Sequence, residues 1–292
     1  MNRFSHISAK IAIVTILLST SYITSHAVMP GEVRWHDETN DTLRVTDILV
    51  KASETERSTG TLVTVIGRNF EGVPYGSGTL EYSPEMLTVN LDTLDCTTFV
   101  EDVMALAMTV EEGRTSWRDF IYNLEKIRYK GGKVDGYASR LHYTSEWIVD
   151  NAHRGNFYEV TSRIAPNIDY QIKTLDFMSA NRDKYPALKD DKEYERLKNM
   201  EIGYRSHRFP YIKSQNVSKA SLREGDIIAI TTKTPGLDVS HMGLIVIAED
   251  GKPHLLHASS KEGKVMVDPL ALADYLRRNK NATGIRVFRF EQ

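Results

Sequence analysis

Residues 91–107, LDTLDCTTFVEDVMALA, contain the only cysteine of the 292-residue chain and decide its fold. After Cys96, apolar residues recur at steps of three and four until Gly113, which predicts an amphipathic helix. Asp95 is a preferred N-cap residue, so we expect the helix to begin at the cysteine. A thiol in the first turn lies near unpaired N–H groups and the positive end of the helix dipole, which both favour the thiolate. The position therefore favours a nucleophile, with a buried structural cysteine as the alternative.

The N-terminus has the features of a secretory signal peptide. Arg3 and Lys10 precede an apolar run at residues 11–23, and Ser25-His26-Ala27 provides a small-x-small cleavage pattern. A membrane-spanning helix is the alternative, but it needs about 20 apolar residues, and this run is shorter. We therefore expect residues 1–27 to be removed and the protein to be secreted across the inner membrane, into the periplasm if the source has an outer membrane.

Composition excludes several classes of partner. The net charge is −2, so the chain has no basic field for nucleic acid, and we expect no stable membrane association after signal cleavage. One cysteine cannot form an internal disulfide, which leaves an accidental thiol, an intermolecular bridge or a reactive group. The sequence has neither an HExxH motif nor a Cys/His cluster, so we expect no metal and no other cofactor.

A nucleophilic thiol needs a base, and residues 240–260, SHMGLIVIAEDGKPHLLHASS, offer two histidines. Two apolar runs flank a turn signal at residues 249–252, which predicts a β-hairpin. His241 opens the first strand and can act as the base, and His257 in the second can orient it. If His241 and His257 lie directly opposite each other, the numbers of every two paired residues add up to 498. The loop must then contain at least residues 248–250. A two-residue turn would place them on opposite faces.

The remaining segments complete an α+β fold. Residues 114–130 have helical spacing, and the charged run at residues 181–200 reads as a solvated helix with Pro186 near its start. Asp268-Pro269 has the form of a helix start, and residues 284–290 read as a final strand. No linker divides the chain, so we expect one domain at residues 28–292 with a helical insertion at about residues 114–215.

Four motifs in this order resemble those of the NlpC-type cell-wall peptidases, a papain-like cysteine superfamily. They are GVPYGSGTLE at residues 72–81, LDCTTFVEDVMALA at residues 94–107, REGDIIAI at residues 223–230 and the two-histidine segment. The N-acetylmuramoyl-L-alanine amidase-like branch of the superfamily is the most similar. The resemblance implies a papain-like core, in which the cysteine helix packs on a small antiparallel sheet.

The resemblance also implies roles for individual residues. Cys96 matches the nucleophile, His241 the base and His257 the residue that orients the base. Tyr75 matches an active-site tyrosine whose hydroxyl supports the substrate or the oxyanion, although a packed core aromatic is an equal alternative. Asp95 binds the stem-peptide amine in peptidase members, but here we favour helix capping.

Two further residues are candidate substrate contacts. Ser240 leaves room around the base, and Arg208 lies in SHRFPYI at residues 206–212. That segment either contacts sugar or peptide or forms a packed connector.

The expected function is that of an exported cysteine amidase. It would cut between N-acetylmuramic acid and L-alanine in peptidoglycan fragments, and the resemblance suggests 1,6-anhydro-muropeptides. The alternatives are a γ-D-glutamyl-diamino acid endopeptidase of the stem peptide, a muropeptide-binding module without catalysis, and a thioesterase or transferase with the same Cys-His chemistry.

Overall fold

The computed structural model describes residues 32–54 and 58–290. The expected signal peptide lies outside these ranges. Of the helices in the described ranges, none combines the length and the apolar character needed to cross a membrane.

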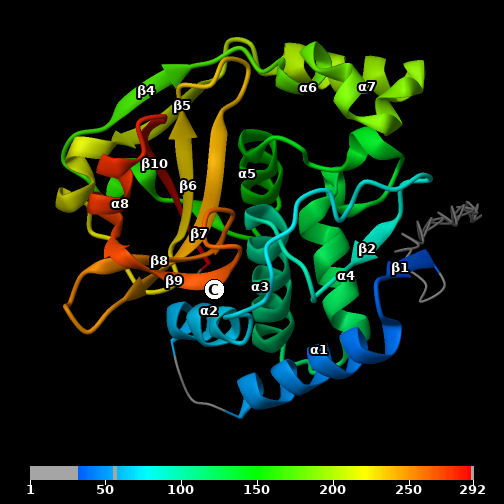
Figure 1. Ribbon diagram of the computed structural model, residues 1–292, viewed down its shortest axis with the longest axis horizontal. Coiled ribbons are helices and arrows are strands. Elements are labelled where there is room, and N and C mark those ends of the chain that lie inside the picture. Colours follow the sequence, from blue (N-terminus) through cyan, green and yellow to red (C-terminus); the bar gives the residue numbers. More distant parts are fainter. Residues whose placement is uncertain (1–31, 55–57, 291–292) are drawn as a thin grey trace, which may run out of the picture.

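An antiparallel sheet of eight strands forms the centre of the described structure (Figure 1). Its order is β4-β5-β10-β6-β7-β8-β9, and β3 also pairs with β10. The strands are β3 Tyr158–Glu159, β4 Asp169–Ile172, β5 Arg208–Lys213, β6 Ile227–Thr232, β7 Val239–Ile247, β8 Pro253–Ser259, β9 Lys264–Ala271 and β10 Ala282–Arg289. A separate parallel pair joins β1 Val33–Trp35 to β2 Leu87–Val89. The mixed architecture confirms the α+β class.

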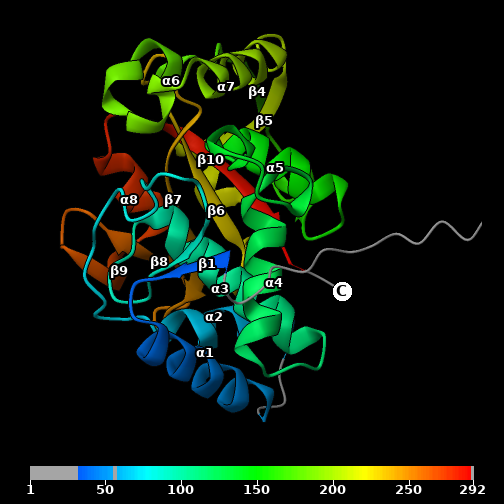
Figure 2. The ribbon, with the colours of Figure 1, turned by 90° about the vertical axis from the view of Figure 1, so that its right-hand side faces the viewer.

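Four helices lie on one side of the sheet, where α2 and α3 pack on its strands and α1 and α4 pack on α3 (Figures 1 and 2). They are α1 Glu38–Ser53, α2 Thr59–Arg68, α3 Cys96–Glu111 and α4 Trp117–Arg128. The helix predicted after Asp95 is α3, which begins at Cys96 and packs on β7 and β8. Its apolar side joins Leu244 and Leu256 of these strands in the largest core cluster. The sheet therefore supports the helix that carries the cysteine.

A second apolar cluster lies on the opposite face of the sheet. There α8, Leu272–Arg278, and the 3₁₀ helix η7, Ser214–Lys219, pack over Ile245 of β7 and Leu255 of β8. Because side chains alternate along a strand, odd-numbered positions in this part of β7 and β8 face α8, and even-numbered positions face α3.

The segment at residues 114–215 is not purely helical, so that part of the prediction is wrong. It contains the predicted helix α4, with α5 Thr144–His153, α6 Phe177–Ala180 and α7 Asp191–Gly203, the last preceded by a 3₁₀ turn that begins at Pro186. The same segment also contributes β3, β4 and β5, which pair with β10 or with each other. These strands make the sheet larger than expected, and residues 206–212 mostly form β5.

The prediction that a helix starts at Asp268-Pro269 is also wrong. Both residues belong to β9, and α8 begins at Leu272. Leu256 pairs with Val267 and His254 with Ala271, so residues 268–270 bulge opposite one residue of β8. A proline is tolerated there because β9 is an edge strand. Strand pairing therefore overrides the local helix-start signal.

Candidate active site

Asp95 fixes the first turn of α3. Its Oδ1 accepts hydrogen bonds from the backbone N–H of Thr97 at 3.0 Å and of Thr98 at 2.8 Å. In return, the Asp95 N–H donates to Oγ1 of Thr98 at 2.9 Å, which completes a capping box. The predicted capping role is confirmed. Asp95 also lines a small pocket of about 140 Å³ with Arg140 and His142.

The Cys96 sulfur is buried between α3 and β7. It accepts a hydrogen bond from the backbone N–H of Met242, the residue that follows His241. Burial, and then the nearby Asp95 carboxylate, raise the pKa of the thiol to about 12. The start of a helix was expected to favour the thiolate, but burial outweighs that effect here.

Tyr75 lies beside the cysteine. Its backbone N–H donates to the Gly263 carbonyl at 2.9 Å, and it forms a β-bridge with Leu94. Burial raises the pKa of the half-buried phenol, and the charges of Cys96 and Asp95 add to this. Tyr75 is thus both partly packed against the core and within electrostatic reach of the thiol.

The two histidines of the hairpin contact each other. Nε2 of His241 lies 2.5 Å from Nδ1 of His257. The loop is longer than two residues, as the hypothesis required, because Ile247 pairs with Pro253. Paired positions sum to 500 rather than 498, so the histidines lie diagonally on one face instead of directly opposite each other. Gly243 makes the approach possible, because a Cβ at this position would lie 3.0 Å from Cβ of His257.

Asp268 and Tyr275 complete the surroundings of His257, and neither was predicted from the sequence as a site residue. Nε2 of His257 lies 3.7 Å from Oδ2 of Asp268 in β9, and the ring of Tyr275 in α8 meets the imidazole edge-on at 5.7 Å. The His257 side chain is only 1% exposed. No local signal marks Asp268 as a site residue, since it reaches the site through the pairing of β8 with β9.

Both imidazoles are neutral at neutral pH. Burial, and then the neighbouring His257, lower the pKa of His241 to about 3. Burial also lowers the pKa of His257 to about 4, and Asp268 opposes this shift.

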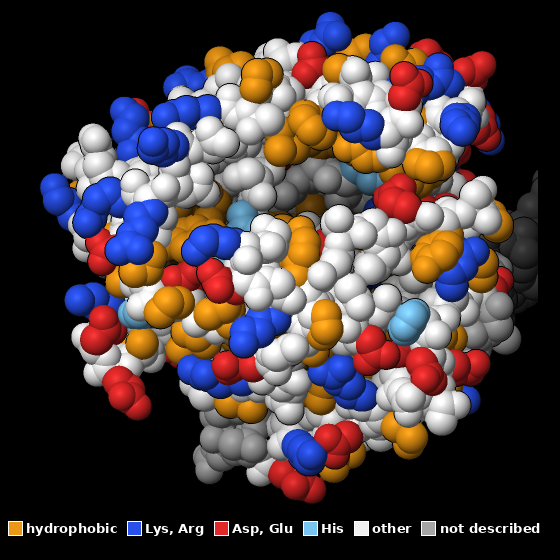
Figure 3. All heavy atoms as spheres, viewed as in Figure 1, with side chains coloured by type: hydrophobic (Ala, Val, Ile, Leu, Met, Phe, Trp, Pro, Cys, Tyr) orange, Lys and Arg blue, Asp and Glu red, His pale blue; other side chains and the backbone are white. Residues whose placement is uncertain are grey.

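The predicted site residues thus fall into two groups. Ser240, His241 and His257 line one pocket of about 560 Å³. Cys96, at the start of α3, meets β7 at Met242, the residue that follows His241. Figure 3 shows histidine side chains at the hollow in this face of the molecule. Within the described residues, no hydrogen bond joins the thiol to either imidazole. Arg208 lies apart on β5, where its guanidinium stacks over the ring of Tyr170 at 4.9 Å.

The described residues contain no group of three or more His, Cys, Asp or Glu side chains that could hold a metal ion.

Comparisons with known proteins identify close relatives. The family model AmiA-like, N-acetylmuramoyl-L-alanine amidase-like, matches residues 65–285. A solved N-acetylmuramoyl-L-alanine amidase from Bacteroides uniformis is 38% identical with a TM-score of 0.74, and the match covers 80% of this chain and 99% of that one. A solved protein described as a putative xylanase from Bacteroides fragilis is 42% identical with a TM-score of 0.72, and the match covers 76% of this chain and 98% of that one.

A more distant structure shares the fold. The Legionella pneumophila protein LPG0564 is 24% identical with a TM-score of 0.66, and the match covers 86% of this chain and 94% of that one. No curated protein sequence matches the chain.

Proposed function

Because the chain belongs to the AmiA-like, N-acetylmuramoyl-L-alanine amidase-like family, we propose that it hydrolyses the amide bond between N-acetylmuramic acid and L-alanine in peptidoglycan fragments. It is an N-acetylmuramoyl-L-alanine amidase, like the solved amidases of that name that are 37% and 38% identical to it. The observation that carries the mechanism is the position of Cys96: its sulfur meets the strand residue next to His241, which in turn contacts His257.

Cys96 is the proposed nucleophile and His241 the general base. The thiol carries a pKa of about 12 and His241 one of about 3, so both start neutral. Proton transfer from sulfur to His241 therefore accompanies the attack on the carbonyl carbon of the lactyl group, rather than preceding it. The C–N bond then breaks as the imidazolium returns the proton to the L-alanine nitrogen. A water molecule, deprotonated by His241, hydrolyses the remaining thioester.

Two donors are proposed for the tetrahedral oxyanion. The backbone N–H of Cys96 is at the first position of α3, where no carbonyl of the helix can accept from it. The Tyr75 hydroxyl lies near the same sulfur, and no hydrogen bond to another described side chain occupies it. One such donor is worth about 3 kcal/mol of transition-state stabilisation in comparable hydrolases.

The finer assignments belong to the same proposal. A helix that starts at its cysteine and packs on an antiparallel sheet supports an NlpC-type, papain-like core. The 1,6-anhydro preference follows from the resemblance of the motifs. Export to the periplasm follows from the N-terminal signal pattern.

Mass spectrometry of a purified anhydro-disaccharide tetrapeptide tests the proposal. Incubation with the mature chain is expected to release free anhydro-disaccharide and intact tetrapeptide. Cys96→Ala is expected to bind the same substrate and to lose at least about 10³-fold in kcat. The substrate with a reducing sugar end, in parallel, tests the anhydro preference.

Other products would refute the proposal. Muramic acid that stays attached to L-alanine-D-glutamate identifies the endopeptidase. Binding without turnover by the unmodified chain identifies a binding module.

A further inference from the structure

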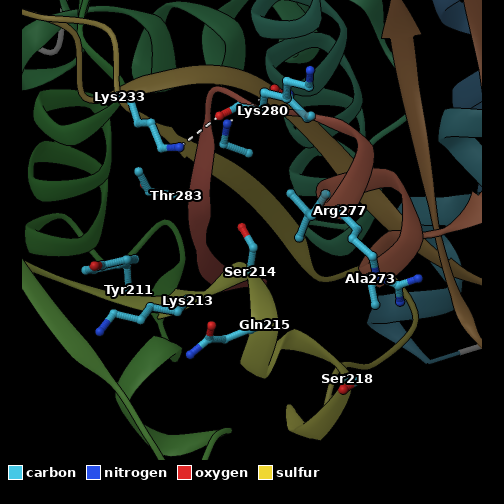
Figure 4. A pocket seen from close by; sticks show the side chains of 13 residues that line it. Tyr211, Lys213, Ser214, Gln215, Ser218, Lys233, Ala273, Arg277, Lys280 and Thr283 are labelled. Carbon is cyan, nitrogen blue, oxygen red and sulfur yellow. Dashed lines mark hydrogen bonds between the residues drawn. The ribbon is translucent and has the colours of Figure 1, made fainter.

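A second and larger pocket, of about 720 Å³, lies between α8, η7, β5 and β10. Its lining, drawn in Figure 4, comes from residues 211–218, which include Ser214, from Lys233 and from residues 273–283. Lys213 ends β5, Lys233 follows β6, Arg277 lies in α8 and Lys280 lies in the turn before β10. We refer to it as the basic pocket.

The lining of the basic pocket has four cationic side chains and no Asp or Glu. The chain as a whole has a net charge of −2, so this local excess does not reflect the average composition. Figure 3 shows Lys and Arg side chains gathered on the part of this face where α8 lies. An excess of one charge in a concave surface raises the local concentration of ligands with the opposite charge.

Two of the four cations have acidic partners outside the lining. Lys213 pairs with Asp169 at 3.2 Å, and Arg277 pairs with Asp274 at 2.7 Å. Lys233 instead donates to the backbone carbonyl of Lys280 at 3.0 Å (Figure 4). Neither Lys233 nor Lys280 has an acidic partner within residues 32–54 or 58–290.

A polar group inside the basic pocket is also unpaired. Oγ of Ser214 is buried, and in the described structure it has no hydrogen-bond partner. A buried hydroxyl without a partner is unfavourable, and a ligand oxyanion could accept its proton. The cations are not explained by compensation of the α8 dipole, since Lys213 and Lys233 come from the ends of two strands.

The basic pocket shares a wall with the pocket of the histidines. Asn279 lines both pockets, while Lys280 faces the basic one and Asn281 the other. The backbone N–H of Lys233 donates to the Asn281 carbonyl at 2.9 Å, which ties this wall to the end of β6. The turn at residues 279–281 therefore separates the pocket of His241 from the basic pocket.

We propose that the basic pocket binds the carboxylates of the peptidoglycan stem peptide, while the pocket of His241 and His257 holds the bond to be cut. This inference rests on the proposed function, which supplies a peptide as the leaving group. Stem peptides carry carboxylates at D-glutamate, at the diamino acid and at the C-terminus, so one peptide offers several anions to several lysines. An extended tetrapeptide spans about 13 Å, long enough to cross a turn between neighbouring pockets.

Calorimetric titration of the unmodified chain with free stem tetrapeptide tests the inference without requiring turnover. Replacing both unpaired lysines, Lys233→Gln with Lys280→Gln, is expected to weaken the Kd by about tenfold. The matched control is Lys189→Gln with Lys192→Gln, which removes two exposed charges near α7 and is expected to leave the Kd unchanged. A tetrapeptide with carboxamides in place of carboxylates should bind weakly to all three proteins.

The Kd should also weaken as NaCl rises from about 50 to about 500 mM, because salt screens exposed charges. An unchanged Kd in the Lys233/Lys280 variant would overturn the inference. Lysine-dependent binding of pyrophosphate with no response to the tetrapeptide would also overturn it and assign the pocket to phosphates. If tetrapeptide binding depends on the lysines but the substrate is never cut, the pocket assignment stands and the proposed function fails.

Discussion

The imidazoles of His241 and His257 meet diagonally across β7 and β8, with Nε2 of the first 2.5 Å from Nδ1 of the second. This contact and the position of Asp268 together assign the protons. The Asp268 carboxylate lies 3.7 Å from Nε2 of His257, beyond hydrogen-bond length, and its negative charge favours a proton on that nitrogen. Nδ1 of His257 must then accept from Nε2 of His241. Nδ1 of His241 then carries no proton, which is the form that the proposed general base requires.

Asp268→Asn tests this assignment. The new amide can donate to Nε2 of His257, which would reverse both tautomers and place a proton on Nδ1 of His241. We expect kcat to fall by about 100-fold with a much smaller change in KM, since the substitution acts on the proton of the base. Asp274→Asn, which removes a carboxylate paired with Arg277 in α8, is the control. Equal kcat values for the two variants would contradict the assignment.

The histidine pair makes the stability of the fold depend on pH. Burial lowers the pKa values of His241 and His257 to about 3 and about 4 in the folded state, below the ordinary 6.5. Between pH 6.5 and pH 4 the two histidines therefore bind more protons in the unfolded chain than in the folded one. The free energy of unfolding should consequently fall as the pH drops from about 6.5 toward 4. The urea concentration at the midpoint of unfolding should change less with pH in the double variant His241→Gln with His257→Gln than in the unmodified chain. An equally steep loss in this variant would assign the dependence to other groups.

The reactivity of the thiol gives a direct readout of its burial. Because the pKa of Cys96 is raised from 9.0 to about 12, alkylation by iodoacetamide should be slow at neutral pH and should keep rising above pH 9. The alkylation rate of unfolded protein in urea should instead be half-maximal near pH 9 and level off above that pH. The chain has one cysteine, so a single mass increment reports the reaction. Fast alkylation of the folded protein at neutral pH would show that a thiolate is already present.

Gly243 is expected to control the spacing of the histidine pair. A Cβ there would lie 2.9 Å from the Leu256 carbonyl oxygen and 3.0 Å from Cβ of His257, so Gly243→Ala must displace β8. We expect a loss of about 1–3 kcal/mol in stability and a fall in kcat. Gly67→Ala is the matched control, because its new Cβ would meet the ends of the Leu256 and Leu244 side chains, which can shift. Retention of kcat in Gly243→Ala would show that the histidine contact tolerates the displacement.

The sequence predicts well those features that depend on neighbouring residues. Asp95 caps α3 because its side chain reaches N–H groups two and three residues ahead, and such a signal can be read locally. The same-face placement of His241 and His257 was also predictable, since it depends only on the parity of the loop.

Features that depend on distant pairing could not be predicted. The diagonal offset of the histidines comes from the five residues between Ile247 and Pro253, a loop length that the turn signal left open. Asp268 carries a local helix-start signal, but its segment pairs with β8. The short strands β3 and β5 each find their partner in β10, more than 70 residues away along the chain. Which strands meet is decided by the whole fold rather than by any one segment.

The central place of β10 has a consequence for biogenesis. Residues 282–289 lie between β5 and β6, so the pair β4-β5 and the group β6-β7-β8-β9 cannot join into one sheet until the ribosome has passed residue 289. The many contacts between distant residues point to slow folding that follows synthesis rather than accompanies it. The strand at the middle of the sheet is thus the last to be made, so the sheet closes only when the strands on both sides of it are already present.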